Sequence, residues 1–311
     1  MNSAVETKKY SKEELLTMYN MPLDKLLEKS SEFMTNEVEF CSLINARNGK
    51  CSQNCKYCAQ SSHYRTDIEC YPLVDIEEVK KAALESKQNH ASRFAIVTSG
   101  RTPDEGRDFN IELEMIKEIN KIQGLNSCAS IGILNEEQAK KLADAGLKRF
   151  HHNINTCRSY YPQVCTTHTY RDRINTCKLV KKYGMELCCG VILGMGESIE
   201  QRIEMAMELA EIEPNSIPIN ILMPIPQTPF ENYHDKIDEE NVLRTLAVFK
   251  IANPKSVLRF CGGRMRLSDE NQKLALQTCV EGIMVGNYLT TIGKEPHQDL
   301  EMVNSLGKKI K

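Results

Sequence analysis

Short apolar runs alternate along this chain with longer stretches whose apolar residues recur at helical spacing. The apolar runs occupy residues 38–46, 93–99, 127–134, 148–155, 186–193, 216–223, 257–261 and 282–288. Helical spacing is clear in the intervening residues 76–90, 135–145 and 170–183. Strands that alternate with helices are typical of βαβ units around a parallel sheet. Eight such runs predict an α/β fold, a (βα)8 TIM-type barrel, with an open doubly wound sheet as the alternative.

The two ends of the chain differ from this repeating part. Residues 11–37 are charged with spaced apolar positions, which predicts a helical extension before the first strand. No linker rich in proline, glycine or serine interrupts the sequence, so we expect one domain. Its expected parts are an N-terminal helical extension (1–37), the barrel (38–290) and a C-terminal tail (291–311). We expect the Lys-rich end from Lys308 to fray.

Composition limits the possible partners and the cellular compartment of the protein. The 311 residues carry a formal net charge of −2, which argues against a nucleic-acid partner or a charged membrane surface. No apolar run is long enough to cross a bilayer, and the first residues lack the apolar core of a signal peptide. Thirteen cysteines in such a chain indicate reduced thiols and metal ligands rather than disulfides. We therefore expect a cytoplasmic protein with no nucleic-acid or membrane partner.

Three of these cysteines, Cys51, Cys55 and Cys58, follow the first apolar run with C-x3-C-x2-C spacing. This order places them in the first βα loop, at the barrel end where active sites lie. A short loop can supply three thiolates to an iron–sulfur cluster, which leaves one iron open to a small molecule. Structural zinc is the weaker interpretation because it needs four ligands, usually as two separated pairs.

The residues around the motif carry a family resemblance. Tyr57 directly precedes the third cysteine, and this form resembles the radical S-adenosylmethionine (SAM) enzymes. The wider segments are CSQNCKYCAQSSHY (51–64), HHNINT (151–156), TTHTYRDR (166–173), GVILGMGE (190–197), PINILMPIPQTP (218–229) and LRFCGGR (258–264). In this order and at these intervals they resemble the biotin synthase family across about residues 38–289.

That resemblance implies an activity and its cofactors. A 4Fe–4S cluster on the three cysteines would bind SAM, and its cleavage by one electron would yield methionine and a 5′-deoxyadenosyl radical. Two SAM molecules would serve to insert sulfur between C6 and C9 of dethiobiotin. The sulfur would come from an auxiliary cluster deep in the barrel. The resemblance further implies a homodimer and an electron donor such as flavodoxin or ferredoxin.

The matching positions suggest roles for individual residues. SAM contacts are expected from Tyr57, Asn153, Asn155, Arg173, Ile192, Gly194 and Glu197. Dethiobiotin contacts are expected from Arg47, His151, Asn153 and Asn220. An amide suits the ureido ring of dethiobiotin because it offers both donors and an acceptor. Three of these positions depart from the usual family residue: Asn155 replaces a common Asp, Arg47 a common Lys, and His151 a common Asn.

The auxiliary cluster departs further from the best-known family pattern of three cysteines and one arginine. Cys128, Cys188 and Arg259 match that pattern, and Arg259 joins the three motif cysteines as an expected catalytic residue. Ala95 stands where the remaining cysteine would be. Cys41 could compensate on the first strand, and Cys261 on the same strand face as Arg259.

This many interior thiols favours a four-iron auxiliary cluster, with 2Fe–2S as the alternative. The simpler interpretation is a protein that binds only the SAM cluster, with the other cysteines packed in the core. Cys189 is expected to point outward into the helix layer. The remaining cysteines (Cys70, Cys157, Cys165, Cys177 and Cys279) are expected to pack as small apolar residues, and His63, His168 and His297 to lie on the surface.

Three functions remain open at this point. A biotin synthase is favoured by the Asn153 and Asn220 pair together with a cluster in the barrel core. Another radical SAM barrel enzyme, a hydrogenase maturase or a carbon-skeleton mutase, would share the fold and the first motif. A non-enzymatic iron–sulfur carrier would need neither an open iron nor a SAM pocket.

Overall fold

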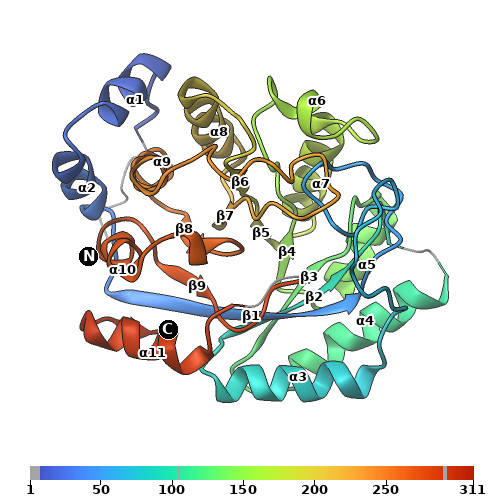
Figure 1. Cartoon of the computed structure of the whole chain (residues 1–311). Helices are drawn as coiled ribbons and strands as arrows, with labels where there is room; N and C mark the ends of the chain where they lie inside the picture. Colours follow the sequence, from blue (N-terminus) through green and yellow to red (C-terminus); the bar gives the residue numbers. More distant parts are fainter. Residues whose placement is uncertain (1–7, 104–105, 290–292) are drawn as a thin grey trace.

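The computed structural model describes residues 8–103, 106–289 and 293–311. Its centre is a closed barrel of parallel strands, surrounded by helices (Figure 1). Neighbouring strands follow the order β1-β2-β3-β4-β5-β7-β8-β9, and β1 pairs with β9 to close the ring, while β6 extends the β5 position beside β7. The strands are β1 (Glu37–Arg47), β2 (Arg93–Thr98), β3 (Asn126–Ser130), β4 (Arg149–His151), β5 (Glu186–Cys188), β6 (Val191–Leu193), β7 (Ser216–Ile221), β8 (Val257–Phe260), β9 (Gly282–Met284) and β10 (Lys309–Ile310).

Helices connect the strands and cover the outside of the barrel (Figure 1). They are α1 (Lys12–Tyr19), α2 (Leu23–Ser31), α3 (Ile76–Gln88), α4 (Arg107–Asn120), α5 (Glu136–Asp144), α6 (Tyr161–Val164), α7 (Tyr170–Lys182), α8 (Ile199–Ile212), α9 (Glu239–Ala252), α10 (Asp269–Thr278) and α11 (Pro296–Ser305), with a 3-10 turn at Arg264–Arg266. Several begin with side-chain caps; at α7, Thr169 and Asp172 each bond the other's backbone N–H. No helix among the described residues is long and apolar enough to span a bilayer.

The predicted (βα)8 barrel is confirmed, and the pairing of β1 with β9 excludes the open sheet. All eight predicted runs contain strands, but the run at 186–193 divides into β5 and β6. Gly190 lies at the division, where an added Cβ would stand 1.9 Å from the Pro218 carbonyl oxygen. Only glycine allows β7 to approach the backbone this closely.

Both ends of the chain pack onto the barrel. The predicted N-terminal helices exist as α1 and α2, which pack against α8 and α9. The expected fraying from Lys308 is wrong, since β10 pairs in parallel with the start of β1. Lys309 stands opposite Glu37 and Ile310 opposite Val38, so this strand lengthens the sheet beyond the barrel.

Candidate active site

The cysteine loop lies between β1 and α3, at the C-terminal ends of the strands. Its backbone folds on itself, with the Cys51 N–H donating to the Gln60 carbonyl at 2.9 Å. It also docks on the segment before α7: the Lys56 N–H donates to the Val164 carbonyl at 3.0 Å, and Asn54 Nδ2 to Thr166 Oγ1 at 2.6 Å. The motif is therefore held by a part of the chain far away in sequence.

Cys51, Cys55 and Cys58 line one cavity at this end of the barrel. Burial raises the pKa of Cys58 to about 11, so its thiol stays protonated until a metal ion displaces the proton. No fourth cysteine is found among the described residues that line the cavity. This donor set fits a 4Fe–4S cluster with one open iron.

Most of the residues expected to contact SAM surround the same cavity, namely Tyr57, Asn153, Asn155, Arg173 and Ile192. Asn155 adopts a left-handed backbone (φ 67°), which asparagine tolerates better than most residues. This conformation lets its N–H donate to the Gly190 carbonyl and its carbonyl accept from the Ile192 N–H. These two backbone hydrogen bonds join the loop after β4 to the start of β6.

Gly194 and Glu197 shape the turn after β6 but do not line this cavity among the described residues. The buried Glu197 carboxylate accepts from the Gly194 and Met195 N–H groups, each at 2.8 Å. Arg202 Nε donates to the same carboxylate at 3.0 Å. Glu197 therefore acts on the turn backbone.

A second cavity continues into the barrel interior, and eight residues line both cavities: Tyr57, Val97, Ser130, His151, Asn153, Ile192, Asn220 and Leu289. Asn153 Oδ1 accepts from the Gly190 N–H at 3.0 Å. Its Nδ2 has no hydrogen-bond partner among the described residues. Asn220 accepts from the Gly262 N–H at 3.0 Å and donates to the Val191 carbonyl at 3.1 Å. Both amides are thus fixed by backbone bonds at the junction of the two cavities.

The other two expected substrate residues differ in placement. His151 lines both cavities, and burial, with Arg149 and Arg259 nearby, lowers its pKa to about 3, so the ring is neutral at pH 7. Arg47 does not line either cavity among the described residues. Its guanidinium donates to Asp108 Oδ2 and to the Ser99 carbonyl, each at 3.1 Å.

The four thiols expected around an auxiliary cluster, Cys41, Cys128, Cys188 and Cys261, lie in the barrel interior, near enough to influence one another's pKa values. All four are buried. Burial raises the pKa of Cys128 to about 12, and the neighbouring thiols of Cys41 and Cys188 add to the rise. Ala95 lies between Leu43 and Cys128 in the sheet, so it adds no ligand to this group.

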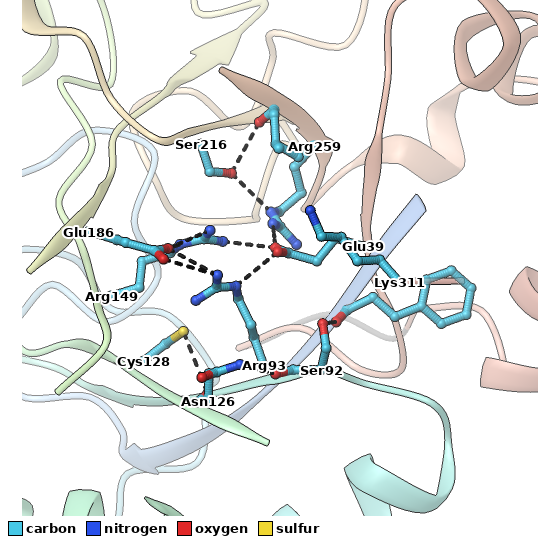
Figure 2. Close-up of polar contacts among 12 residues, drawn as sticks. Glu39, Ser92, Arg93, Asn126, Cys128, Arg149, Glu186, Ser216, Arg259 and Lys311 are labelled. Atoms are coloured by element: carbon cyan, nitrogen blue, oxygen red, sulfur yellow. Dashed lines mark hydrogen bonds and ion pairs between the residues drawn. The ribbon is translucent and has the colours of Figure 1, made fainter. Parts of the chain in front are cut away.

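Buried charges share the barrel interior with these thiols (Figure 2). The Glu39 carboxylate pairs with Arg93 at 2.9 Å, with Arg149 at 2.8 Å and with Arg259. Nη1 of Arg93 and Nη1 of Arg259 are buried without a hydrogen-bond partner among the described residues. Buried donors are rarely left unpaired, and an anionic sulfide cluster among the thiols would supply acceptors for them. The interior therefore fits an iron–sulfur cluster chemically.

Two residues near the cysteine loop were missed from the sequence. His168 was expected on the surface, which is wrong: it is 4% exposed, and its Nε2 lies 3.5 Å from Cys55 Sγ. Cys165, expected only to pack, lies 3.7 Å from the same sulfur. Their C-x2-H spacing is the signal that could have identified them. As expected, His63 and His297 are exposed and Cys189 contacts Cys177 on α7. The expectation that Cys70 packs as a small apolar residue is wrong, because this cysteine is exposed in the β1–α3 connection.

Comparison with known proteins gives matches to two family profiles and to several sequence relatives. A profile described as Radical SAM superfamily matches residues 47–210, and one described as Biotin and Thiamin Synthesis associated domain matches residues 218–309. Biotin synthase of Acetivibrio thermocellus is 47% identical over 287 residues, which cover 92% of this chain and 88% of that protein. Biotin synthase of Clostridioides difficile is 41% identical over 316 residues, covering 98% and 96%.

Solved structures support the fold alone. Methylornithine synthase (PylB) superposes with a TM-score of 0.83 at 17% identity, covering 98% of this chain and 95% of its own. The [FeFe]-hydrogenase maturase HydG gives the same TM-score at 16% identity, covering 98% and 72%. At such low identity these likenesses do not favour a maturase or a mutase. By its sequence relatives, the chain belongs to the biotin synthase family of the radical SAM superfamily.

Proposed function

We propose that this protein is a biotin synthase, a radical SAM sulfurtransferase that converts dethiobiotin to biotin. The observation that carries the proposal is a continuous arrangement along the barrel axis. The cavity lined by Cys51, Cys55 and Cys58 shares its wall with a second cavity at Asn153 and Asn220. The second cavity reaches Cys261, one of the four buried thiols. Radical generation, substrate and sulfur source would thus occupy successive levels of one barrel.

The three motif cysteines would hold a 4Fe–4S cluster and leave its open iron for SAM. When bound, the cluster and SAM supply an electron transfer that yields methionine and a 5′-deoxyadenosyl radical. Tyr57, Asn155, Arg173 and Ile192 would position SAM from the cavity wall. Glu197 would act through the backbone of Gly194, which it holds in its turn.

Dethiobiotin would bind at the junction of the cavities. Asn153 has its amide oxygen committed to the Gly190 N–H, so its Nδ2 can donate to the ureido carbonyl. Asn220, anchored by two backbone bonds, would present the remainder of its amide to the same ring. Neutral His151 would lie against the substrate, and Arg47 would contribute only if its ion pair with Asp108 opened.

The auxiliary cluster would be held by Cys41, Cys128 and Cys188, with Cys261 as a further ligand. Four thiols favour a four-iron cluster over 2Fe–2S. Arg259 would lie beside the cluster rather than bind it through every nitrogen, because Nε donates to Ser216 and Nη2 pairs with Glu39. Its unpartnered Nη1 would face the sulfur.

The proposal also includes a cellular location, an oligomeric state and an electron donor. Thirteen free cysteines suit a cytoplasmic location, where thiols stay reduced. A homodimer and an electron donor such as flavodoxin or ferredoxin rest on the family resemblance.

The test is anaerobic reconstitution with iron and sulfide, followed by incubation with SAM, dithionite and dethiobiotin. We expect biotin together with 5′-deoxyadenosine. Formation of 5′-deoxyadenosine without biotin would point to another radical SAM reaction. Absence of SAM binding in a titration of the reconstituted protein would favour an iron–sulfur carrier.

A further inference from the structure

Three buried ligand groups converge behind the cysteine loop. Cys55 Sγ lies 3.7 Å from Cys165 Sγ, and His168 Nε2 lies 3.5 Å from each sulfur. They are the one group of three or more such side chains that converges closely enough for a single metal ion among the described residues. Cys55 comes from the cysteine loop, and the other two come from the segment before α7.

These distances match the edges of a metal tetrahedron. With zinc bonds of about 2.3 Å to sulfur and about 2.0 Å to nitrogen, tetrahedral ligands stand about 3.8 Å apart for two sulfurs and about 3.5 Å for sulfur and nitrogen. The observed sulfur–sulfur distance is 3.7 Å and both sulfur–nitrogen distances are 3.5 Å, close to these values. A central ion would thus be bound without moving these three side chains, with its fourth position open to water. The neighbouring Arg173 guanidinium, 3.2 Å from His168 Nε2, would turn away to leave that nitrogen to the ion.

The tautomer of His168 is suited to binding a metal ion. Arg173 Nη2 lies 3.2 Å from His168 Nε2, and a guanidinium can only donate, so Nε2 must carry the lone pair. The proton then sits on Nδ1, which donates to Tyr161 Oη at 2.8 Å. Metal-binding histidines are commonly fixed by such a bond from the other ring nitrogen.

Charge and access also suit an ion. Two thiolate ligands balance a divalent cation, so the occupied site carries no net charge beside Arg173. His168 and Cys165 line a pocket on the outer side of the loop, whereas His168 and Cys55 line the inner cavity of the motif. The three residues therefore stand in the wall between an outer opening and the cluster cavity.

We propose that Cys55, Cys165 and His168 bind a single divalent transition-metal ion in the chain that has not yet received its 4Fe–4S cluster. The site takes an ion that accepts tetrahedral ligation by two sulfurs and one nitrogen, such as Zn²⁺ or Fe²⁺. Cys55 belongs both to this site and to the cluster motif, so the ion and the cluster compete for one thiolate. This inference does not depend on the reaction that the assembled enzyme performs.

The first test is a titration of the full-length, cluster-free chain with Co²⁺, read by thiolate-to-cobalt absorption. The background is a Cys51→Ser, Cys58→Ser double variant, which prevents the motif from binding ions as a set. In this background, adding Cys165→Ala should remove one bound Co²⁺ or weaken its Kd by more than about 100-fold, since loss of an outer-sphere partner alone costs 10–100-fold. His168→Gln should act in the same direction.

Cys177→Ala is the matched control, because Cys177 is a buried thiol next to a second cysteine, Cys189, outside the site. It should leave the number of bound ions and their affinity unchanged. The proposal is wrong if the Cys165→Ala chain binds as many Co²⁺ ions, as tightly, as its parent.

The second test needs no substitution. Zn²⁺ added to the cluster-free native chain should protect Cys55 and Cys165 together from alkylation, mapped by mass spectrometry. The same Zn²⁺ should slow cluster assembly from iron and sulfide until a chelator removes it. If Cys165 is alkylated at an unchanged rate while Cys55 is protected, the ion is held by the motif alone and the proposal fails.

Discussion

Glu39 on β1 and Arg259 on β8 form an ion pair inside the barrel (Figure 2). Arg259 is fully buried, and Glu39 also pairs with Arg93 and Arg149 (Figure 2). Burial opposes the charge of Arg259, but Cys41, Glu39 and Cys188 nearby raise its pKa well above the usual value. One carboxylate thus pairs with three guanidinium groups, which lie near the thiols of the proposed sulfur source.

Replacing Glu39 should therefore destabilise the fold. The variant Glu39→Gln would leave three arginines close together in the barrel. Among the described residues, Glu186 would remain to pair with two of them, Arg93 and Arg149. Loss of one partner of a buried ion pair costs about 3–5 kcal/mol, and we expect a fall of this size in the free energy of unfolding measured with urea. Glu37→Gln, at an exposed pair with Lys311, is the control and should change it by less than about 0.5 kcal/mol.

The contribution of Glu39 should depend on pH. Burial alone would raise its pKa, but Arg259, Arg149 and Arg93 outweigh burial and bring the pKa far below the ordinary carboxylate value. A lowered pKa in the folded state stabilises above the unfolded pKa of about 4.3 and is lost as pH falls. The stability difference between the native chain and Glu39→Gln should shrink by about 1.4 kcal/mol per pH unit below that value. A constant difference between pH 6 and pH 3 would contradict this assignment.

Cys55→Ala should abolish 5′-deoxyadenosine formation, because a cluster with an open iron would lose one of its three protein ligands. The measurement is SAM cleavage under dithionite after reconstitution. Cys70→Ala, an exposed cysteine in the same β1–α3 connection, should cleave SAM normally. If Cys55→Ala still releases 5′-deoxyadenosine, the motif is not the SAM cluster site.

Asn220→Ala should weaken dethiobiotin binding about tenfold or more, since an unpaired buried polar group costs about 1–3 kcal/mol. SAM binding should change little in parallel calorimetric titrations. The variant also frees the Gly262 N–H and the Val191 carbonyl, so some loss of stability is expected. Asn126→Ala, a strand amide that bonds the Ser92 carbonyl at the opposite end of the barrel, should leave binding unchanged. Equal weakening of both ligands by Asn220→Ala would indicate a general disturbance of the site.

The barrel could be predicted because each strand position carries its own apolar run between amphipathic helices. The fold differs from the prediction at two places, the division of the 186–193 run and the pairing of the C-terminus as β10. Both arise from contacts between segments that are distant in the sequence. Gly190 divides one run because β7 approaches its backbone, and β10 consists of two residues whose only structural signal is pairing with β1. Neither feature has a local pattern that sequence periodicity could reveal.

The candidate site also has a part that the sequence predicts and a part that depends on tertiary contacts. Cys51, Cys55 and Cys58 are close in sequence, so their spacing alone predicts a cluster loop. Cys165 and His168 join Cys55 only because the loop docks on the segment before α7 through Asn54 and Lys56. Arg47 was expected near the substrate, but its pairing with Asp108 depends on where α4 packs. Such partners follow from tertiary contacts rather than from a motif.

The thiols of the barrel interior lead to the last prediction. Cys41 stands opposite Arg93 and Met284 in the neighbouring strands, near enough to Cys128, Cys188 and Arg259 to influence their pKa values.

Cys41→Ala removes a thiolate that Ala95 cannot replace, so the auxiliary cluster should fail to form while the SAM cluster assembles. Iron in the reconstituted chain should fall by about four atoms if that cluster has four irons. Biotin formation should stop while 5′-deoxyadenosine release continues. The control is Cys189→Ala, a buried thiol directed at Cys177 in the helix layer, which should retain its iron and its activity. Full iron content and normal biotin formation in Cys41→Ala would show that Cys41 is not a ligand, and the compensation for Ala95 would then have to come from Cys261 alone.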